Sequence, residues 1–221
     1  GKIDLNRANR ARLAAIPGVE SVGLVLTLPL DEGAGDARVA TQGYDGPPET
    51  APRVRVTFTG GDYFQTMSIQ LLSGSYFEER TDPTTDVHAI ISRSAAERLW
   101  PGENPLGQVL RPAGAPDAFP WITVGGVAED VILADFREQT PEPLIYLPMV
   151  GPTAQAWGVG TPAYVVKSAR AETMAPEIRA VVQEVAPGAP MYRIFTMAGL
   201  AARSMAHHYY TLQLDENTLA S

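Results

Sequence analysis

Two stretches of the chain show the same order of apolar and polar positions, and each order predicts a strand, a helix and a second strand. Apolar residues alternate with polar ones in the expected strands, and they recur every three to four positions in the expected helices. The predicted units cover 53–74, where Asp62 is a candidate helix N-cap, and 163–196, where the helix spans 171–185. Two such units favour an α+β fold, a split βαβ or ferredoxin-like sandwich.

The N-terminal part predicts a helix, a strand and a long connection. A helix is expected over 3–16, and Pro17-Gly18 ends it. Its irregular apolar stripe consists of Ile3, Leu5, Ala8, Leu13 and Ile16. Val and Leu residues predict a strand over 19–28, whereas a high density of Gly, Pro and Asp predicts a loop over 29–52. A second connection of this kind is expected over 151–162.

The central part contains a strand, a helix and a turn that follow one another closely. A strand is expected around Ala89, and Ser92 or Ser94 is a candidate cap for the helix that follows. The helix stops at 100–102, where the sequence is Trp-Pro-Gly, and a turn over 104–107 leads into two further strands. This segment offers no nucleophile setting and no phosphate-binding loop.

A short strand over 144–147 closes the central part. Pro143 and Pro148 bracket this strand. Because proline cannot donate a ladder hydrogen bond, we expect the strand to lie at a sheet edge.

The Gly/Pro-rich punctuation divides the chain into two predicted subdomains. Residues 1–75 and 151–221 would form the flanking α+β subdomain, and 76–150 an inserted, mixed α/β subdomain. If so, residues 87–91 should not pair centrally within the sheet that contains 54–58 and 164–167.

Charge and composition narrow the classes of partner. The formal net charge is -8, which argues against a nucleic-acid binder, since such proteins need a basic face. The chain has no cysteine, which excludes disulfides and thiolate metal sites. No apolar run approaches the ~20 residues that span a bilayer, and no signal peptide is visible at the start. If the sequence is taken alone, the lack of a membrane span and a signal peptide would suggest a cytoplasmic protein. If the sequence is a loop between two membrane helices, the same observations say nothing about its location.

The polar residues yield no catalytic, cofactor-binding or metal site. Glu129-Asp130 and Glu78-Glu79 are acidic pairs, but neighbours on a strand point to opposite faces and cannot share one substrate. His207 and His208 are adjacent, which places them about 100° apart on a helix and makes them poor chelators.

Aromatic residues provide two candidate contact regions. The first is a surface for an apolar ligand or partner, with core packing as the favoured alternative; its residues are Trp100, Phe119, Trp121 and Phe136. The second is a membrane-proximal stretch, for which an ordinary amphipathic terminus is an equal alternative; its residues are His207, His208, Tyr209 and Tyr210.

Several motifs carry a resemblance to a known family when they are taken in order along the chain. They are IPGVESVG at 16–23, DYFQTMSIQLLSG at 62–74, the strand–helix–WPG–turn segment at 89–110, YLP at 146–148 and EIRAVVQEVAPGAP at 177–190. Together they resemble the extracytoplasmic, or periplasmic core, domain of MacB-type ABC-transporter permeases, especially the duplicated-permease branch. One departure is polar Asp215-Glu216-Asn217, where the family would begin a membrane helix.

The resemblance implies a function and a location. In that family the domain has a porter-like part and an inserted part and lies between the first two membrane helices. It would be a non-catalytic domain on the periplasmic side of a bacterial inner membrane, coupling cytoplasmic ATP hydrolysis to substrate extrusion. The implied partners are an ATPase subunit or domain, with a second permease copy and a periplasmic adaptor as further candidates. If the domain joins two membrane helices, the helices expected over 5–16 and 197–210 should leave from the same face.

Two other classes of function stay open at this point. The chain could be a stand-alone binding module for a hydrophobic or peptide ligand, or a hydrolase whose site has no recognised motif. Apolar segments of about 20 residues flanking this sequence would separate the permease from the binding module.

Overall fold

The computed structural model describes residues 2–26, 35–78, 88–115, 119–131, 141–159 and 162–185. The helices in these ranges are α1 (Lys2–Ala14), α2 (Tyr63–Thr66), α3 (Arg93–Leu99), α4 (Pro152–Ala156) and α5 (Ala175–Val185), with short 3-10 turns η1 (Pro48–Thr50) and η2 (Ala171–Thr173). The strands are β1 (Val19–Val25), β2 (Gly35–Thr41), β3 (Arg53–Gly61), β4 (Leu71–Gly74), β5 (His88–Ser92), β6 (Val109–Pro112), β7 (Ile122–Ala128), β8 (Leu144–Pro148) and β9 (Ala163–Ser168).

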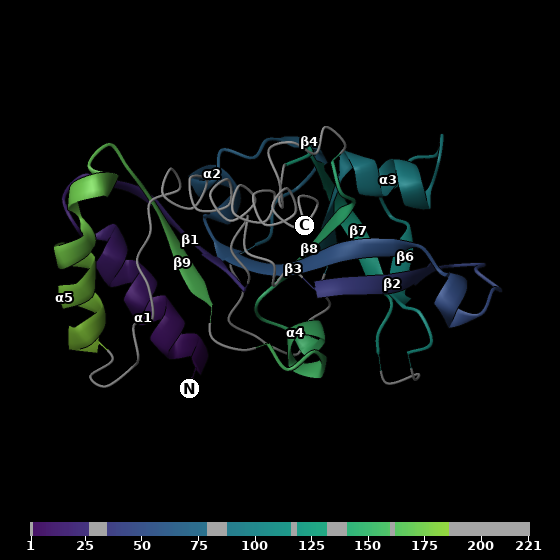
Figure 1. Ribbon diagram of the computed structural model, residues 1–221, viewed down its shortest axis with the longest axis horizontal. Coiled ribbons are helices and arrows are strands. Elements are labelled where there is room, and N and C mark those ends of the chain that lie inside the picture. The colour runs from purple at the N-terminus through teal and green to yellow at the C-terminus, as the bar shows by residue number, and fades with distance from the viewer. Residues whose placement is uncertain are drawn as a thin grey trace, which may run out of the picture.

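All of these strands belong to one mixed sheet, which confirms the expected α+β class (Figure 1). Its order is β2-β6-β7-β5-β8-β3-β1-β9, and β4 adds to β7. The first half of β2 pairs with β3 and its second half pairs with β6. The six strands from β2 to β3 therefore close on themselves, and we call them the six-strand ring. Beyond the ring, β1 lies between β3 and β9 and is antiparallel to both.

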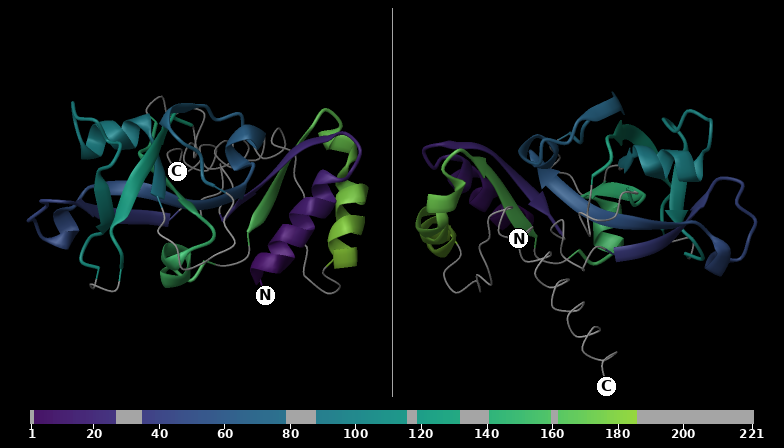
Figure 2. Two further views of the ribbon diagram at one scale, coloured as in Figure 1. Left: turned by 180° about the vertical axis from the view of Figure 1, so that it is seen from behind. Right: turned by 45° about the horizontal axis from the view of Figure 1, so that its top comes forward.

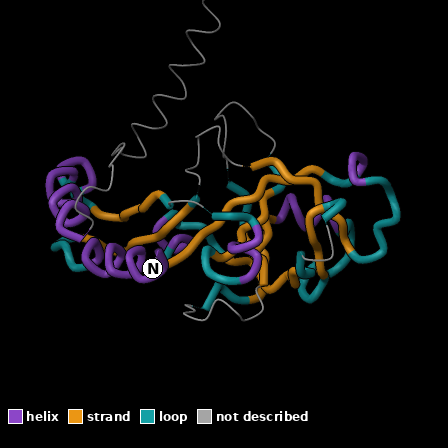
Figure 3. The backbone as a smooth tube through the Cα atoms, turned by 90° about the horizontal axis from the view of Figure 1, so that it is seen from below, coloured by secondary structure: helices purple, strands orange, loops and turns teal. Residues whose placement is uncertain are grey.

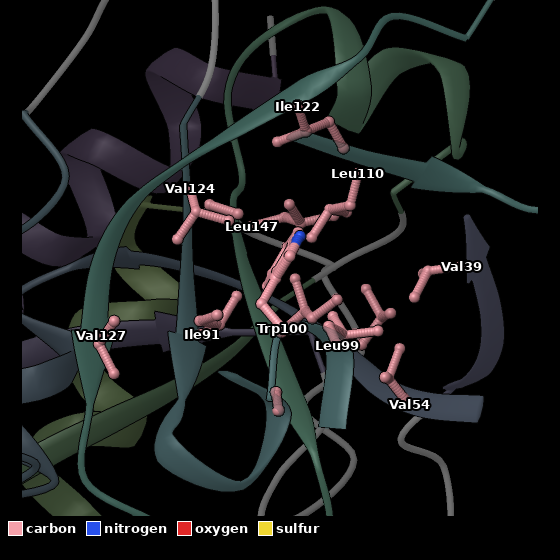
Figure 4. Close-up of a cluster of buried hydrophobic side chains, with 14 of the residues drawn as sticks. Val39, Val54, Ile91, Leu99, Trp100, Leu110, Ile122, Val124, Val127 and Leu147 are labelled. Carbon is pink, nitrogen blue, oxygen red and sulfur yellow. The ribbon is translucent and has the colours of Figure 1, made fainter. Parts of the chain in front are cut away.

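The largest apolar cluster lies where the six-strand ring encloses its side chains (Figure 4). Every strand of the ring contributes to it, with Val39, Val56, Ile91, Leu110, Val124 and Leu147 among its members. Leu99 and Trp100, at the end of α3, and Ala154 of α4 complete the cluster. The alternation in β3, where Val54, Val56 and Phe58 share one face, is what directs this strand into the cluster.

The pairing of β5 overturns one expectation. It lies between β7 and β8, near the middle of the sheet that also contains β3 and β9. The statement that 87–91 would stay outside the centre of that sheet is therefore wrong for the described residues 88–91. The physical reason is that Ala89, Ile90 and Ile91 are all fully buried and need apolar neighbours on both faces. The division into subdomains at 75 and 151 stays a prediction.

β8 is a central strand, so its expected edge position is also wrong. It pairs with β3 in parallel and with β5 in antiparallel orientation, and its residues from Leu144 to Leu147 are buried. The flanking prolines do not prevent this, because they stand at the ends, where few ladder donors are needed. The carbonyl of Pro143 even accepts a hydrogen bond from the Arg55 amide at 2.7 Å.

Two segments expected to be loops contain regular structure. β2 falls within the predicted loop over 29–52, and α4 falls within the predicted connection over 151–162. β2 carries only one buried apolar residue, Val39, so its sequence shows no alternation. Its strand conformation comes from its two neighbours, β3 and β6, which it joins to close the ring.

The two longest described helices, α1 and α5, lie side by side at the end of the molecule where β1 and β9 extend the sheet (Figures 1 and 2). The view from below shows the same separation between this helical end and the strand-rich remainder (Figure 3). A separate small core joins them, formed by Leu13, Ile16, Val22 and Met174. None of the described helices is both long and apolar enough to cross a membrane.

Local signals in the central segment were predicted well. The Ser92 hydroxyl caps α3 by accepting a hydrogen bond from the Ala95 amide at 3.2 Å. Asn104 Oδ1 accepts from the Leu106 amide at 3.1 Å in the expected turn. Asp62 stands at the N-cap position of α2, but its side chain makes no capping hydrogen bond. The strand expected over 191–195 and the last helix lie outside the described residues.

Candidate functional site

The carboxylates of Glu129 and Asp130 hold neighbouring elements onto the end of β7. Glu129 Oε1 accepts a hydrogen bond from the Gln70 amide, and Asp130 Oδ1 accepts one from the Ser94 amide, both at 2.9 Å. Both residues follow the last residue of β7, and their side chains bind separate segments, Gln70 just before β4 and Ser94 in α3. This gives both carboxylates a structural role.

The described residues do not bring metal ligands together. No group of three or more His, Cys, Asp or Glu side chains that could hold a metal ion occurs among them. His207 and His208 lie outside the described residues, as do Tyr209 and Tyr210.

Of the four aromatic residues of the candidate ligand surface, the structure describes Trp100, Phe119 and Trp121. Trp100 is 7% exposed and belongs to the apolar cluster of the six-strand ring, which is the core packing that the sequence analysis favoured over a ligand surface. Trp121 is 43% exposed, Phe119 is half-buried, and Phe136 is outside the described residues.

Trp121 has a cationic neighbour on the adjacent strand. The guanidinium carbon of Arg111 lies 4.6 Å from the centroid of the indole ring, within the range of a cation–π contact. This contact orders an exposed aromatic side chain at the start of β7.

The most specific polar arrangement joins α1 to the sheet. The Tyr164 hydroxyl, on β9, donates to Asn6 Oδ1 at 3.0 Å and accepts from Asn9 Nδ2 at 3.1 Å. Asn9 is only 5% exposed. Burial raises the pKa of Tyr164, an effect that the Asn9 hydrogen bond partly opposes, so the phenol keeps the proton that it donates to Asn6.

Two ion pairs surround this arrangement. Arg10 lies 3.7 Å from Asp62 at the start of α2, and Arg12 lies 2.5 Å from Glu184 of α5. The side chains of Arg12 and Glu184 are both more than half exposed, so this pair contributes little to stability.

The buried face of α1 differs from the apolar stripe expected from the sequence. Asn9, Leu13 and Ile16 are buried and Asn6 is half-buried, whereas Ala8 is exposed. The apolar stripe expected from the sequence includes neither Asn6 nor Asn9. The available signal was their spacing, because positions 6, 9 and 13 are separated by three or four residues and therefore share one face of α1.

Comparison with known families decides what kind of domain this is. The family model described as the MacB-like periplasmic core domain matches residues 3–191. The chain belongs to this family. It is thus the extracytoplasmic domain of a MacB-like ABC transporter permease, in a family whose members work with an ATPase. No protein with a curated description matches the sequence.

Solved structures show the same fold at low sequence identity. The periplasmic region of MacB from Actinobacillus actinomycetemcomitans has a TM-score of 0.52 and 15% identity, covering 81% of this chain and 71% of that one. The extracellular domain of the noncanonic ABC-type transporter YknZ from Gram-positive bacteria has a TM-score of 0.52 and 14% identity, covering 80% and 81%. At these identities the likeness concerns the fold alone.

Proposed function

We propose that this domain is a non-catalytic coupling element, which turns ATP-driven movement of its permease into a conformational change outside the membrane and thereby into substrate extrusion. Family membership supports the transporter setting. The observation that carries the coupling role is the attachment of α1 to the sheet through Tyr164, Asn6 and Asn9. Because α1 is attached by both apolar and polar contacts, a displacement of this helix would move β1 and β9 with it.

The proposal includes further partners. A second permease copy and a periplasmic adaptor are the candidates, and Trp121 with Phe119 and Phe136 is the proposed contact surface. The exposure of Trp121 supports this, since aromatic residues are enriched where proteins bind each other. We further propose that His207, His208, Tyr209 and Tyr210 lie near the membrane, where tyrosine is enriched at the headgroup level.

Coupling is tested on the full-length permease with its ATPase in a lipid nanodisc. Hydrogen exchange is compared between the ADP state and a vanadate-trapped state. We expect exchange in peptides from α1 and β9 to change between the two states. An ATPase variant that binds but does not hydrolyse ATP is the matched control, because it cannot be trapped. Identical exchange throughout the domain in both states, with ATP turnover intact, would refute coupling.

The absence of a catalytic role is tested with isosteric amides. Glu129→Gln and Asp130→Asn keep an oxygen that accepts from the Gln70 and Ser94 amides, but they remove both carboxylates. We expect the double variant to fold and to retain transport. A folded double variant that has lost transport would contradict the proposal.

A further inference from the structure

The interface between α1 and the sheet combines an apolar core with polar contacts, among them the Arg10–Asp62 ion pair and the group of Asn6, Asn9 and Tyr164. Leu13 and Ile16 pack with Val22 and Met174, and side chains of β9 and α5 surround them. Apolar contacts are non-directional, so they tolerate small rotations and shifts of a helix. Hydrogen bonds weaken steeply when their geometry is lost. The two hydrogen bonds among Asn6, Asn9 and Tyr164 are shorter than the 3.7 Å Arg10–Asp62 contact, so this polar group defines the position of α1 more sharply.

The phenol of Tyr164 donates one hydrogen bond and accepts one, whereas Asn9 Oδ1 has no hydrogen-bond partner. The single hydroxyl proton of Tyr164 goes to Asn6, so Asn9 must present its amino group to the phenol oxygen. Asn6 and Asn9 are three residues apart and point to the same side of the helix. A slip of α1 by one residue would rotate it by about 100° and break both hydrogen bonds.

Such a slip would take Leu13 and Ile16 out of their core, and it would add a polar cost at Asn9. This residue is 5% exposed, so its amide would have to stay buried without the phenol. Leaving a buried polar group unpaired disfavours a state by roughly 10- to 100-fold. The exposed Arg12–Glu184 pair imposes no comparable cost, because its ends can be solvated in either position.

We infer that Asn6, Asn9 and Tyr164 form a register lock, a set of positioning residues that holds α1 at one height and one rotation on β9. The inference rests on the proposed coupling function, since a helix that can slip on the sheet would lose part of the movement it transmits. The lock supplies specificity of position more than stability, as a buried asparagine does in the seam of a coiled coil.

The test uses the absence of cysteine in the chain. Ala8 on α1 and Glu97 on α3 are both exposed, and cysteines at these two positions carry spin labels. A rotation of about 100° moves a point on the helix surface, roughly 5 Å from the axis, by about 8 Å. Pulsed electron paramagnetic resonance resolves two distances between the spin labels that differ by about 8 Å.

The informative variant removes both polar partners together. In the double variant Asn9→Leu with Tyr164→Phe, the buried Asn9 amide is removed together with its partner, so the free energy of unfolding should stay close to that of wild type. We expect a broadened or doubled distance distribution in this variant, and a single narrow one in wild type and in the control Arg12→Ala. If the residues served only stability, the distribution would stay narrow. A narrow distribution in the folded double variant overturns the lock.

The same variant separates the lock from the coupling proposal. In the full-length permease, we expect a several-fold loss of transport with ATP turnover retained. A broadened distribution with normal transport would support the lock and count against coupling through α1. An unchanged distribution would overturn the lock whatever the transport rate.

Discussion

Ser92 offers the sharpest stability test, because one buried hydroxyl serves two separate elements. Its oxygen accepts from the Ala95 amide at 3.2 Å, which caps α3, and from the Leu144 amide at 3.0 Å, which holds the start of β8. The residue is 1% exposed, so water cannot replace the hydroxyl in Ser92→Ala. Loss of the cap costs about 1 kcal/mol, and a buried amide left unpaired costs about 1–3 kcal/mol. The expected loss is therefore about 2–4 kcal/mol.

Urea unfolding followed by circular dichroism measures this loss. The transition midpoint should fall while the slope stays unchanged, as for a change in stability alone. Ser94→Ala is the matched control, because its hydroxyl makes only a 3.3 Å contact to the Glu142 carbonyl and a 3.0 Å contact to Ser92. It should cost less than about 1 kcal/mol. If both variants lose the same amount, or if Ser92→Ala loses less than about 1 kcal/mol, the dual role of Ser92 is refuted.

Three further predictions concern single positions. Gly74→Ala should lower the free energy of unfolding by about 2–4 kcal/mol, because φ is +81° and an added Cβ would lie 2.1 Å from the Gly125 carbonyl oxygen. The control Gly107→Ala has a similar φ of +84° but no atom near the added Cβ, so it should cost about 1 kcal/mol. Equal losses in the two variants would contradict the packing argument. Burial raises the pKa of Tyr146, so above about pH 10 the unfolded chain binds fewer protons than the folded chain, and the stability of the fold falls as pH rises. In alkaline denaturation, Tyr146→Phe should make this fall in stability less steep. An unchanged slope of stability against pH would contradict the prediction. Trp121→Phe should remove most of the fluorescence that acrylamide quenches, since the other two tryptophans are less exposed; undiminished quenching would show that Trp121 is shielded.

Local chemistry made the central segment predictable. The serine cap of α3, the stop at Trp100-Pro101-Gly102 and the turn at 104–107 each depend on residues a few positions apart. Gly102 and Gly107 adopt φ values of +77° and +84°, which glycine tolerates and other residues rarely adopt. Such signals operate before any long-range contact forms, so the sequence alone identifies them.

The candidate site was only partly accessible to this reasoning. The exposed Trp121 and the structural carboxylates Glu129 and Asp130 were singled out in the sequence, but their partners come from other elements. Asn9 was not among the predicted buried positions of its helix, because its partner, Tyr164, is 155 positions away. A buried polar residue has no distinguishing local pattern when the group that satisfies it is remote in sequence.

The sequence by itself determined the α+β class, most helices and strands of the described residues, and the family through the order of its motifs. The tertiary structure decided where each strand lies. β2 is a strand because β3 and β6 hydrogen bond to its two edges, and β8 is central because its apolar residues are covered on both faces. Strand order is set by which edges meet across long separations, and backbone hydrogen bonding is the same for every residue except proline. The pattern of side chains alone therefore cannot specify the order of the strands in the sheet.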